Sequence, residues 1–117
     1  MRTLWHGTTR SRGEAIVRNG PDPSYREPNS ENPVEGLSAA PPGGPYLQGD
    51  PAIIARGKSV LFPGEGGPVI LEFAVSEDIA ALADFVVEVR FMPGFGMEEL
   101  LNIWPQLPKR LIDLSQP

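Results

Sequence analysis

The stretch that decides the fold is Val69-Ile70-Leu71-Glu72-Phe73-Ala74-Val75, in which one set of alternate side chains is wholly large and apolar and the other set contains a carboxylate. Every second residue from Val69 to Val75 is large and apolar, whereas Glu72 lies on the other face. Successive side chains of a β-strand point to opposite faces, so this period of two predicts a strand with one buried face. The stretch from Phe85 to Phe91 alternates in the same way and predicts a second strand.

Shorter elements are predicted around these two strands. Asp50 followed by Pro51 predicts a helix through Ala55 that ends at Gly57. Capping, stop and spacing signals predict further helices over 11–19, 76–82 and 97–104. Short strands are predicted at 4–5, 59–62 and 107–114. A turn is predicted at 6–9 and a cluster of turn residues at 63–68. Six prolines between positions 21 and 44 predict a long irregular loop. The pattern as a whole predicts one α+β domain over residues 1–117, with mostly antiparallel sheets and short helices.

The composition narrows the possible chemistry. The 117 residues include no cysteine and one histidine, which excludes a thiolate site and any site with two imidazoles. With 10 Lys+Arg against 15 Asp+Glu, the net charge of −5 disfavours binding to a nucleic-acid backbone. No apolar run is long enough to span a bilayer, and the amino end has no signal-peptide core, so we expect a cytoplasmic protein without a membrane partner.

Positive charge is concentrated near the amino end of this acidic chain. Four arginines lie between the initial strand and position 26, namely Arg10, Arg12, Arg18 and Arg26. A solvated helix face explains most clusters of this kind, and binding of a pyrophosphate is the alternative.

The single histidine, His6, follows Trp5 and precedes Gly7-Thr8. At the end of a strand, its imidazole would be held in place by the sheet. A partly buried structural imidazole is the other interpretation of this residue. Trp5 and Trp104 are expected to be core residues.

The segment Leu4-Trp5-His6-Gly7-Thr8-Thr9, followed by a helix with Ala15-Ile16 and then Gly20, resembles the opening of the ADP-ribosyltransferase superfamily. The resemblance is to the branch that includes poly(ADP-ribose) polymerases and diphtheria-type toxins. The amino-acid sequence matches the family motif over the first twenty residues, and the order of predicted helices and strands agrees over most of the chain. It implies an ADP-ribosyltransferase-like fold, NAD as the cofactor, and transfer of ADP-ribose to a protein or small-molecule acceptor. Whether the protein is a toxin with an immunity or antitoxin partner stays open.

The same resemblance implies roles for individual residues. His6 would hydrogen-bond a ribose hydroxyl of NAD, Gly7 would approach the nicotinamide carboxamide closely because it lacks a Cβ, and Thr8 would add a hydroxyl contact. An aromatic residue of the family stacks on the nicotinamide ring, and Tyr46 is the match before the 51–57 helix. The stretch Gly36-Leu37-Ser38 is a competing match to that part of the motif.

The reaction also needs a carboxylate. Breaking the bond between nicotinamide and ribose forms an oxocarbenium-like centre, which a nearby carboxylate stabilises. Glu88 is the first choice for this family residue, Glu72 the second and Glu98 the third. An outward-facing carboxylate beside Arg90 is the alternative interpretation of Glu88.

Two other functions remain in view. One is a catalytically inactive module of the same fold that binds NAD or ADP-ribose, or that mediates protein interaction. The other is the related tRNA 2′-phosphotransferase, which also opens with His-Gly-Thr and uses NAD. The acidic balance and the absence of a second histidine argue against the phosphotransferase.

Overall fold

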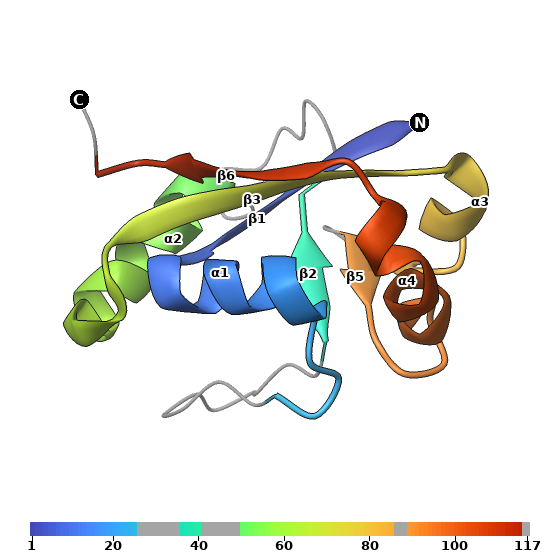
Figure 1. Ribbon diagram of the computed structural model, residues 1–117, viewed down its shortest axis with the longest axis horizontal. Helices are drawn as coiled ribbons and strands as arrows, with labels where there is room; N and C mark the ends of the chain where they lie inside the picture. The colour runs from blue at the N-terminus through green and yellow to red at the C-terminus, as the bar shows by residue number, and fades with distance from the viewer. Residues whose placement is uncertain (26–35, 41–49, 86–88, 116–117) are drawn as a thin grey trace.

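The computed structural model describes residues 1–25, 36–40, 50–85 and 89–115. Figure 1 shows the arrangement of its helices and strands. The strands are β1 (Arg2–Thr9), β2 (Leu37–Ala39), β3 (Pro68–Val75), β4 (Asp84–Phe85), β5 (Val89–Phe91) and β6 (Lys109–Asp113). The α-helices are α1 (Arg10–Asn19), α2 (Pro51–Leu61), α3 (Glu77–Ala80) and α4 (Met97–Ile103), and the 3-10 helices are η2 (Pro63–Glu65) and η3 (Trp104–Gln106).

Two antiparallel sheets organise the domain. The first has the strand order β1-β3-β6 and the second the order β2-β5-β4. In Figure 1, β2, β5, α1 and α4 lie on one side of the first sheet. The α+β class with antiparallel sheets, predicted from the sequence, is therefore confirmed, as are the strand over 69–75 and the last strand at a sheet edge.

The core lies between the two sheets and α4. The apolar face of β3 is fully buried, with Leu71, Phe73 and Val75 in this core and Val69 beside Gly13 of α1, each at most 1% exposed. From the other side, Trp104 packs against Phe73 with ring centroids 5.5 Å apart, and its indole Nε1 donates a hydrogen bond to the Val17 carbonyl at 3.2 Å. This partner satisfies the one polar group of the buried indole. The expectation that Trp104 is a core residue is confirmed.

Helix α2 differs in length from the prediction. Its start is as expected, because the Asp50 side chain accepts a hydrogen bond from the Ala52 amide. The helix does not end at Gly57 but continues to Leu61, so the predicted strand at 59–62 is wrong. Gly57 is exposed and costs the helix little more than backbone entropy, which the packing of α2 on β1 and β3 overcomes.

The junction of β1 and α1 also corrects the prediction. Strand β1 runs through 6–9 without a turn, so His6 lies inside the strand and not at its end. Helix α1 then begins directly at Arg10, with Thr9 as an N-cap whose side chain makes no capping bond, and Ser11 lies within the helix. The predicted stop is confirmed, since Gly20 ends the helix with φ 81°.

Strand pairing accounts for two further differences. Residues 37–39 lie in the predicted long loop, yet they form β2 because β5 pairs with them. The predicted strand over 85–91 is not one strand, because β4 and β5 are separate and pair antiparallel with each other. Alternation alone does not reveal where a chain reverses direction.

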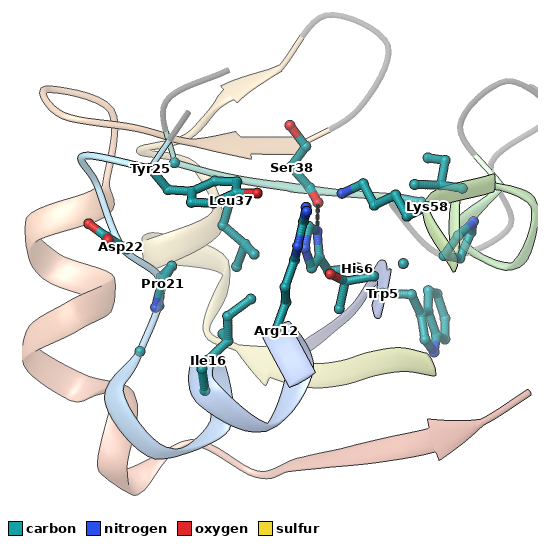
Figure 2. Close-up of a pocket in the computed structure, with 18 of the residues that line it drawn as sticks. Trp5, His6, Arg12, Ile16, Pro21, Asp22, Tyr25, Leu37, Ser38 and Lys58 are labelled. Atoms are coloured by element: carbon teal, nitrogen blue, oxygen red, sulfur yellow. Dashed lines mark hydrogen bonds between the residues drawn. The ribbon is translucent and has the colours of Figure 1, made fainter. Parts of the chain in front are cut away.

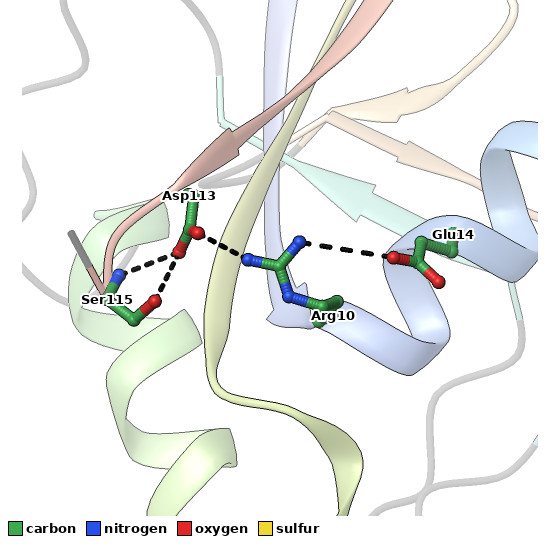
Figure 3. Close-up of polar contacts among 4 residues, drawn as sticks. All are labelled: Arg10, Glu14, Asp113 and Ser115. Atoms are coloured by element: carbon green, nitrogen blue, oxygen red, sulfur yellow. Dashed lines mark hydrogen bonds and ion pairs between the residues drawn. The ribbon is translucent and has the colours of Figure 1, made fainter.

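An ion-pair cluster ties the start of α1 to the end of β6. Figure 3 shows the Arg10 guanidinium between Asp113 and Glu14, with Glu14 one helical turn away at 3.9 Å. The Asp113 carboxylate also accepts hydrogen bonds from the Ser115 amide at 2.9 Å and the Ser115 hydroxyl at 2.6 Å. These Ser115 bonds are the largest cause of the lowered pKa of Asp113, and Arg10 adds to it. Among the described residues, no helix is long and apolar enough to cross a bilayer.

Candidate functional site

The site lies where the two sheets meet. Within the described ranges, β1 and β2 share one bridge, in which the Ala40 amide donates to the Trp5 carbonyl at 2.9 Å and the Trp5 amide to the Ala40 carbonyl at 3.4 Å. If this antiparallel pairing continued, Gly7 would stand opposite Ser38. The strands separate instead, and within the described ranges no strand pairs with this edge of β1 beyond Trp5.

The His6 side chain bridges this gap. Its Nδ1 lies 2.6 Å from the carbonyl oxygen of Ser38 on β2, as the dashed line in Figure 2 marks. A carbonyl oxygen only accepts hydrogen bonds, so Nδ1 carries the proton when the ring is neutral. The second ring nitrogen, Nε2, then has the lone pair and is an acceptor.

The imidazole is neutral over the whole physiological range. Burial is the largest cause that lowers the pKa of His6, to about 3, and the positive charges of Lys58 and Arg12 lower it further. The hydrogen bond to Ser38 opposes this shift but does not outweigh it. His6 therefore serves as a fixed hydrogen-bonding group and does not act as a cation.

A cavity of about 790 Å³ lies along this edge, between α1 and α2. It is lined by all three residues that the sequence analysis placed together, namely His6, Gly7 and Thr8. The volume falls in the range of ordinary small-molecule and cofactor pockets. Trp5 also lines the cavity and is only partly buried, so the expectation of a core residue is wrong for Trp5.

Gly7 presents its backbone to the open edge. Alternate residues of an antiparallel strand direct their N–H and C=O groups to the same edge, and Trp5 uses its groups to pair with Ala40. The N–H and C=O of Gly7 therefore point toward the same side as those of Trp5. Packing gives a further reason for glycine here, because a Cβ on Gly7 would lie 2.0 Å from the Pro51 carbonyl oxygen. It is the first turn of α2 that requires glycine at this position.

Two cations line the cavity from opposite helices. Arg12 extends from α1 and Lys58 from α2, as Figure 2 shows. The Arg12 Nε donates to Glu65 at 2.7 Å, and its guanidinium lies 4.3 Å from the ring centroid of Phe62. The side chain of Arg12 is only 15% exposed. Arg12 is thus held in one orientation at the cavity wall.

Two of the three glutamates predicted as candidates for the catalytic carboxylate lie away from the cavity. Glu72 lies on β3, where it accepts a hydrogen bond from the Trp5 indole Nε1 and another from Arg110, both at 2.9 Å. Glu98 lies on α4 and accepts from the Gly94 amide at 3.0 Å. Neither residue lines the cavity. Glu88 and Tyr46 lie outside the described residues.

Sequence reasoning missed some contributors to the site. Lys58 was assigned to no site, because the phosphate-binding loop that Gly57-Lys58-Ser59 could end needs a glycine where this chain has Ala52. Ser38 contributes a backbone carbonyl, for which a sequence carries no signal. Arg12 was visible only as part of the arginine cluster, whose other described members, Arg10 and Arg18, do not line the cavity.

Comparisons with protein-family models, with curated proteins and with solved structures give no match to this chain.

Proposed function

We propose that this cavity binds NAD and that the protein is an ADP-ribosyltransferase, with a protein or small molecule as the acceptor. The observation that carries the proposal is the neutral His6, fixed by the Ser38 carbonyl at the open edge of β1. A ribose hydroxyl donates a hydrogen bond to an acceptor of this kind. The resemblance of the amino end to the superfamily opening assigns the same task to the same residue.

The edge of β1 complements nicotinamide. A carboxamide has one acceptor oxygen and one donor NH2 group, and a strand edge offers an N–H and a C=O side by side. Gly7 has this pair on the side of the open edge. We propose that Gly7 holds the carboxamide, while Thr8 and Tyr46 keep their predicted roles as a hydroxyl contact and a ring that stacks on nicotinamide.

We propose Glu88 as the carboxylate that faces the scissile sugar. Its chain neighbour Val89 begins β5 and pairs with Ala39, which adjoins the cavity-lining Ala40, and this supports Glu88 over Glu72 and Glu98. In the proposed reaction, the bond from ribose C1′ to nicotinamide breaks and its electron pair leaves with nicotinamide. The acceptor then bonds to C1′ and releases its proton. The carboxylate stabilises the positive charge that develops on the sugar.

Calorimetric titration with NAD, combined with chromatographic detection of released nicotinamide, tests the proposal. Wild-type protein should bind NAD saturably and release nicotinamide, and His6→Ala should weaken the binding about tenfold or more. Glu88→Gln should bind NAD but lose release, while Glu72→Gln is the matched control with both retained. Absence of NAD binding by folded protein at millimolar cofactor would contradict the proposal.

A catalytically silent NAD or ADP-ribose binder is the second candidate. Among the described residues that line the cavity, Asp22 is the only carboxylate, and it accepts hydrogen bonds from the Ser24 amide and hydroxyl. Tight binding without nicotinamide release, together with a Glu88→Gln variant that behaves like the wild type, would select this function.

A further inference from the structure

We infer that Arg12 and Lys58 form a diphosphate subsite, which takes the pyrophosphate of a nucleoside-diphosphate ligand across the open edge of β1. The inference rests on the proposed function, because a pyrophosphate joins the two nucleosides of NAD. It names the part of the ligand that these two side chains would hold.

The two cations lie on different helices and line the same cavity. Arg12 lies on α1 and Lys58 on α2, and these helices flank the strand edge that carries His6. Both side chains reach the same cavity, as Figure 2 shows. A diphosphate has oxygens on both of its phosphorus atoms, so it can contact cations that approach from two sides.

Electrostatics supports the placement. Lys58 and Arg12 both lower the pKa of His6, so both positive charges act on the group at the centre of the cavity. His6 itself is neutral there and does not compensate an anion. The chain as a whole carries a net charge of −5, which repels an anionic ligand, so a local pair of cations is needed to hold one.

The setting of Arg12 is suited to a phosphate. Glu65 holds the guanidinium through Nε, and the same carboxylate accepts a hydrogen bond from Thr9 at 2.8 Å. Burial opposes the change in the pKa of Glu65, but the hydrogen bonds from Thr9 and Arg12 and the positive charges of Arg12 and Lys58 lower it overall, so Glu65 stays ionised and offsets part of the charge of both cations. Phe62 and Tyr25 flank the guanidinium, with ring centroids at 4.3 and 5.3 Å. A planar donor fixed in this way loses little entropy when it binds an oxyanion.

The test compares probes that differ in phosphate. Calorimetric titrations use ADP, inorganic pyrophosphate and adenosine with the wild type and with Lys58→Gln, Arg12→Gln and Arg56→Gln. Arg56 is the matched control, because it lies on α2, is exposed and does not line the cavity. Circular dichroism shows whether Arg12→Gln remains folded, and Lys58→Gln carries the test if Arg12→Gln does not.

We expect ADP and pyrophosphate to bind the wild type, and Lys58→Gln to weaken both about tenfold. Arg56→Gln should stay within about twofold of the wild type, and adenosine affinity should be the same in all variants. Affinity for ADP should also fall as salt is raised. Equal affinity for ADP and adenosine in the wild type, or an unchanged ADP affinity in Lys58→Gln, would overturn the inference.

The same measurements separate this inference from the proposed function. ADP binding that depends on Lys58, without any nicotinamide release from NAD, supports the subsite and contradicts the transferase. If the wild type and Lys58→Gln both release nicotinamide with the same KM for NAD, the result contradicts the subsite and supports the transferase.

Discussion

Nδ1 of His6 lies 2.6 Å from the carbonyl oxygen of Ser38, and this contact joins two sheets whose described strands share only one other bridge, between Trp5 and Ala40. The contact decides which imidazole nitrogen is protonated and leaves Nε2 as the acceptor. The same separation of β1 from β2 leaves the backbone of Gly7 with no strand partner on that edge among the described residues. The opening between the sheets and the chemistry of the site therefore have one structural cause.

The low pKa of His6 predicts a specific dependence of stability on pH. The unfolded chain takes up a proton near the ordinary value of 6.5, whereas the folded chain does so only near 3, so the free energy of unfolding falls as pH falls through this interval. One proton sets a limiting slope of about 1.4 kcal/mol per pH unit. Glutamates with lowered pKa, such as Glu65 and Glu72, add their own losses of stability only below about their ordinary value of 4.5.

Denaturant unfolding at a series of pH values measures this dependence. Because the chain has one histidine, a comparison of wild type with His6→Gln isolates its contribution. The variant should have a flatter profile between pH 6.5 and about 4.5. Parallel profiles for the two proteins would show that His6 titrates normally in the folded state.

Gly7→Ala is expected to be strongly destabilising. The added Cβ would lie 2.0 Å from the Pro51 carbonyl oxygen, and this backbone atom moves only if the first turn of α2 moves. We expect a loss of about 3 kcal/mol in the free energy of unfolding, measured by denaturant titration. Gly57→Ala is the matched control, since nothing lies within 4 Å of its Cβ position. It should stabilise α2 by about 0.5–1 kcal/mol, and a similar loss in both variants would contradict the packing argument.

Glu72→Gln is expected to have little effect on catalysis. The Glu72 carboxylate is directed to the indole of Trp5 and to Arg110, and it does not line the cavity. Its rate of nicotinamide release should stay within about twofold of the wild type, whereas Glu88→Gln should lose about a hundredfold or more. The stability cost should be below about 1 kcal/mol, because Arg110 is largely exposed. A large loss in the rate of nicotinamide release in Glu72→Gln would indicate that Glu72 is the catalytic carboxylate.

Asp113→Ala should loosen the link between α1 and β6. The change removes the ion pair with Arg10 and both hydrogen bonds from Ser115. These groups are partly exposed, so we expect a loss of about 1 kcal/mol in the free energy of unfolding. Glu14→Ala removes only the 3.9 Å contact with Arg10 and should change stability by a few tenths of a kcal/mol. Equal losses in the two variants would show that the Asp113 contacts contribute nothing specific.

Elements with a purely local signal were predicted well. The alternation in β3 and the spacing of Met97, Leu100, Leu101 and Trp104 each indicate one buried face, and the structure buries those faces, with Leu101 partly buried. Asp50 and Ser76 cap α2 and α3 as expected, because a cap depends on residues only two or three positions away. Periodicity and capping depend on nearby residues, which is why a sequence can carry these signals, although the helix predicted to start at Ser11 begins at Arg10.

Elements that depend on a distant partner were missed. Strand β2 exists because β5 pairs with it, and nothing within 37–39 signals that partner. The split of 85–91 into β4 and β5 was missed for the same reason, since both parts share one alternating pattern. In α2, packing on β1 and β3 carries the helix past Gly57, where local propensity predicted its end.

At the candidate site, the sequence alone determined the residue types: one imidazole, a glycine and a threonine in succession near the amino end, within a chain that has no cysteine and a net negative charge. The tertiary structure decided everything that depends on a second segment of chain. It brought the Ser38 carbonyl to His6, placed Pro51 against Gly7, and set Arg12 and Lys58 around one cavity. The physical reason is that protonation, packing and electrostatic potential depend on distance in space, whereas a sequence records only separation along the chain.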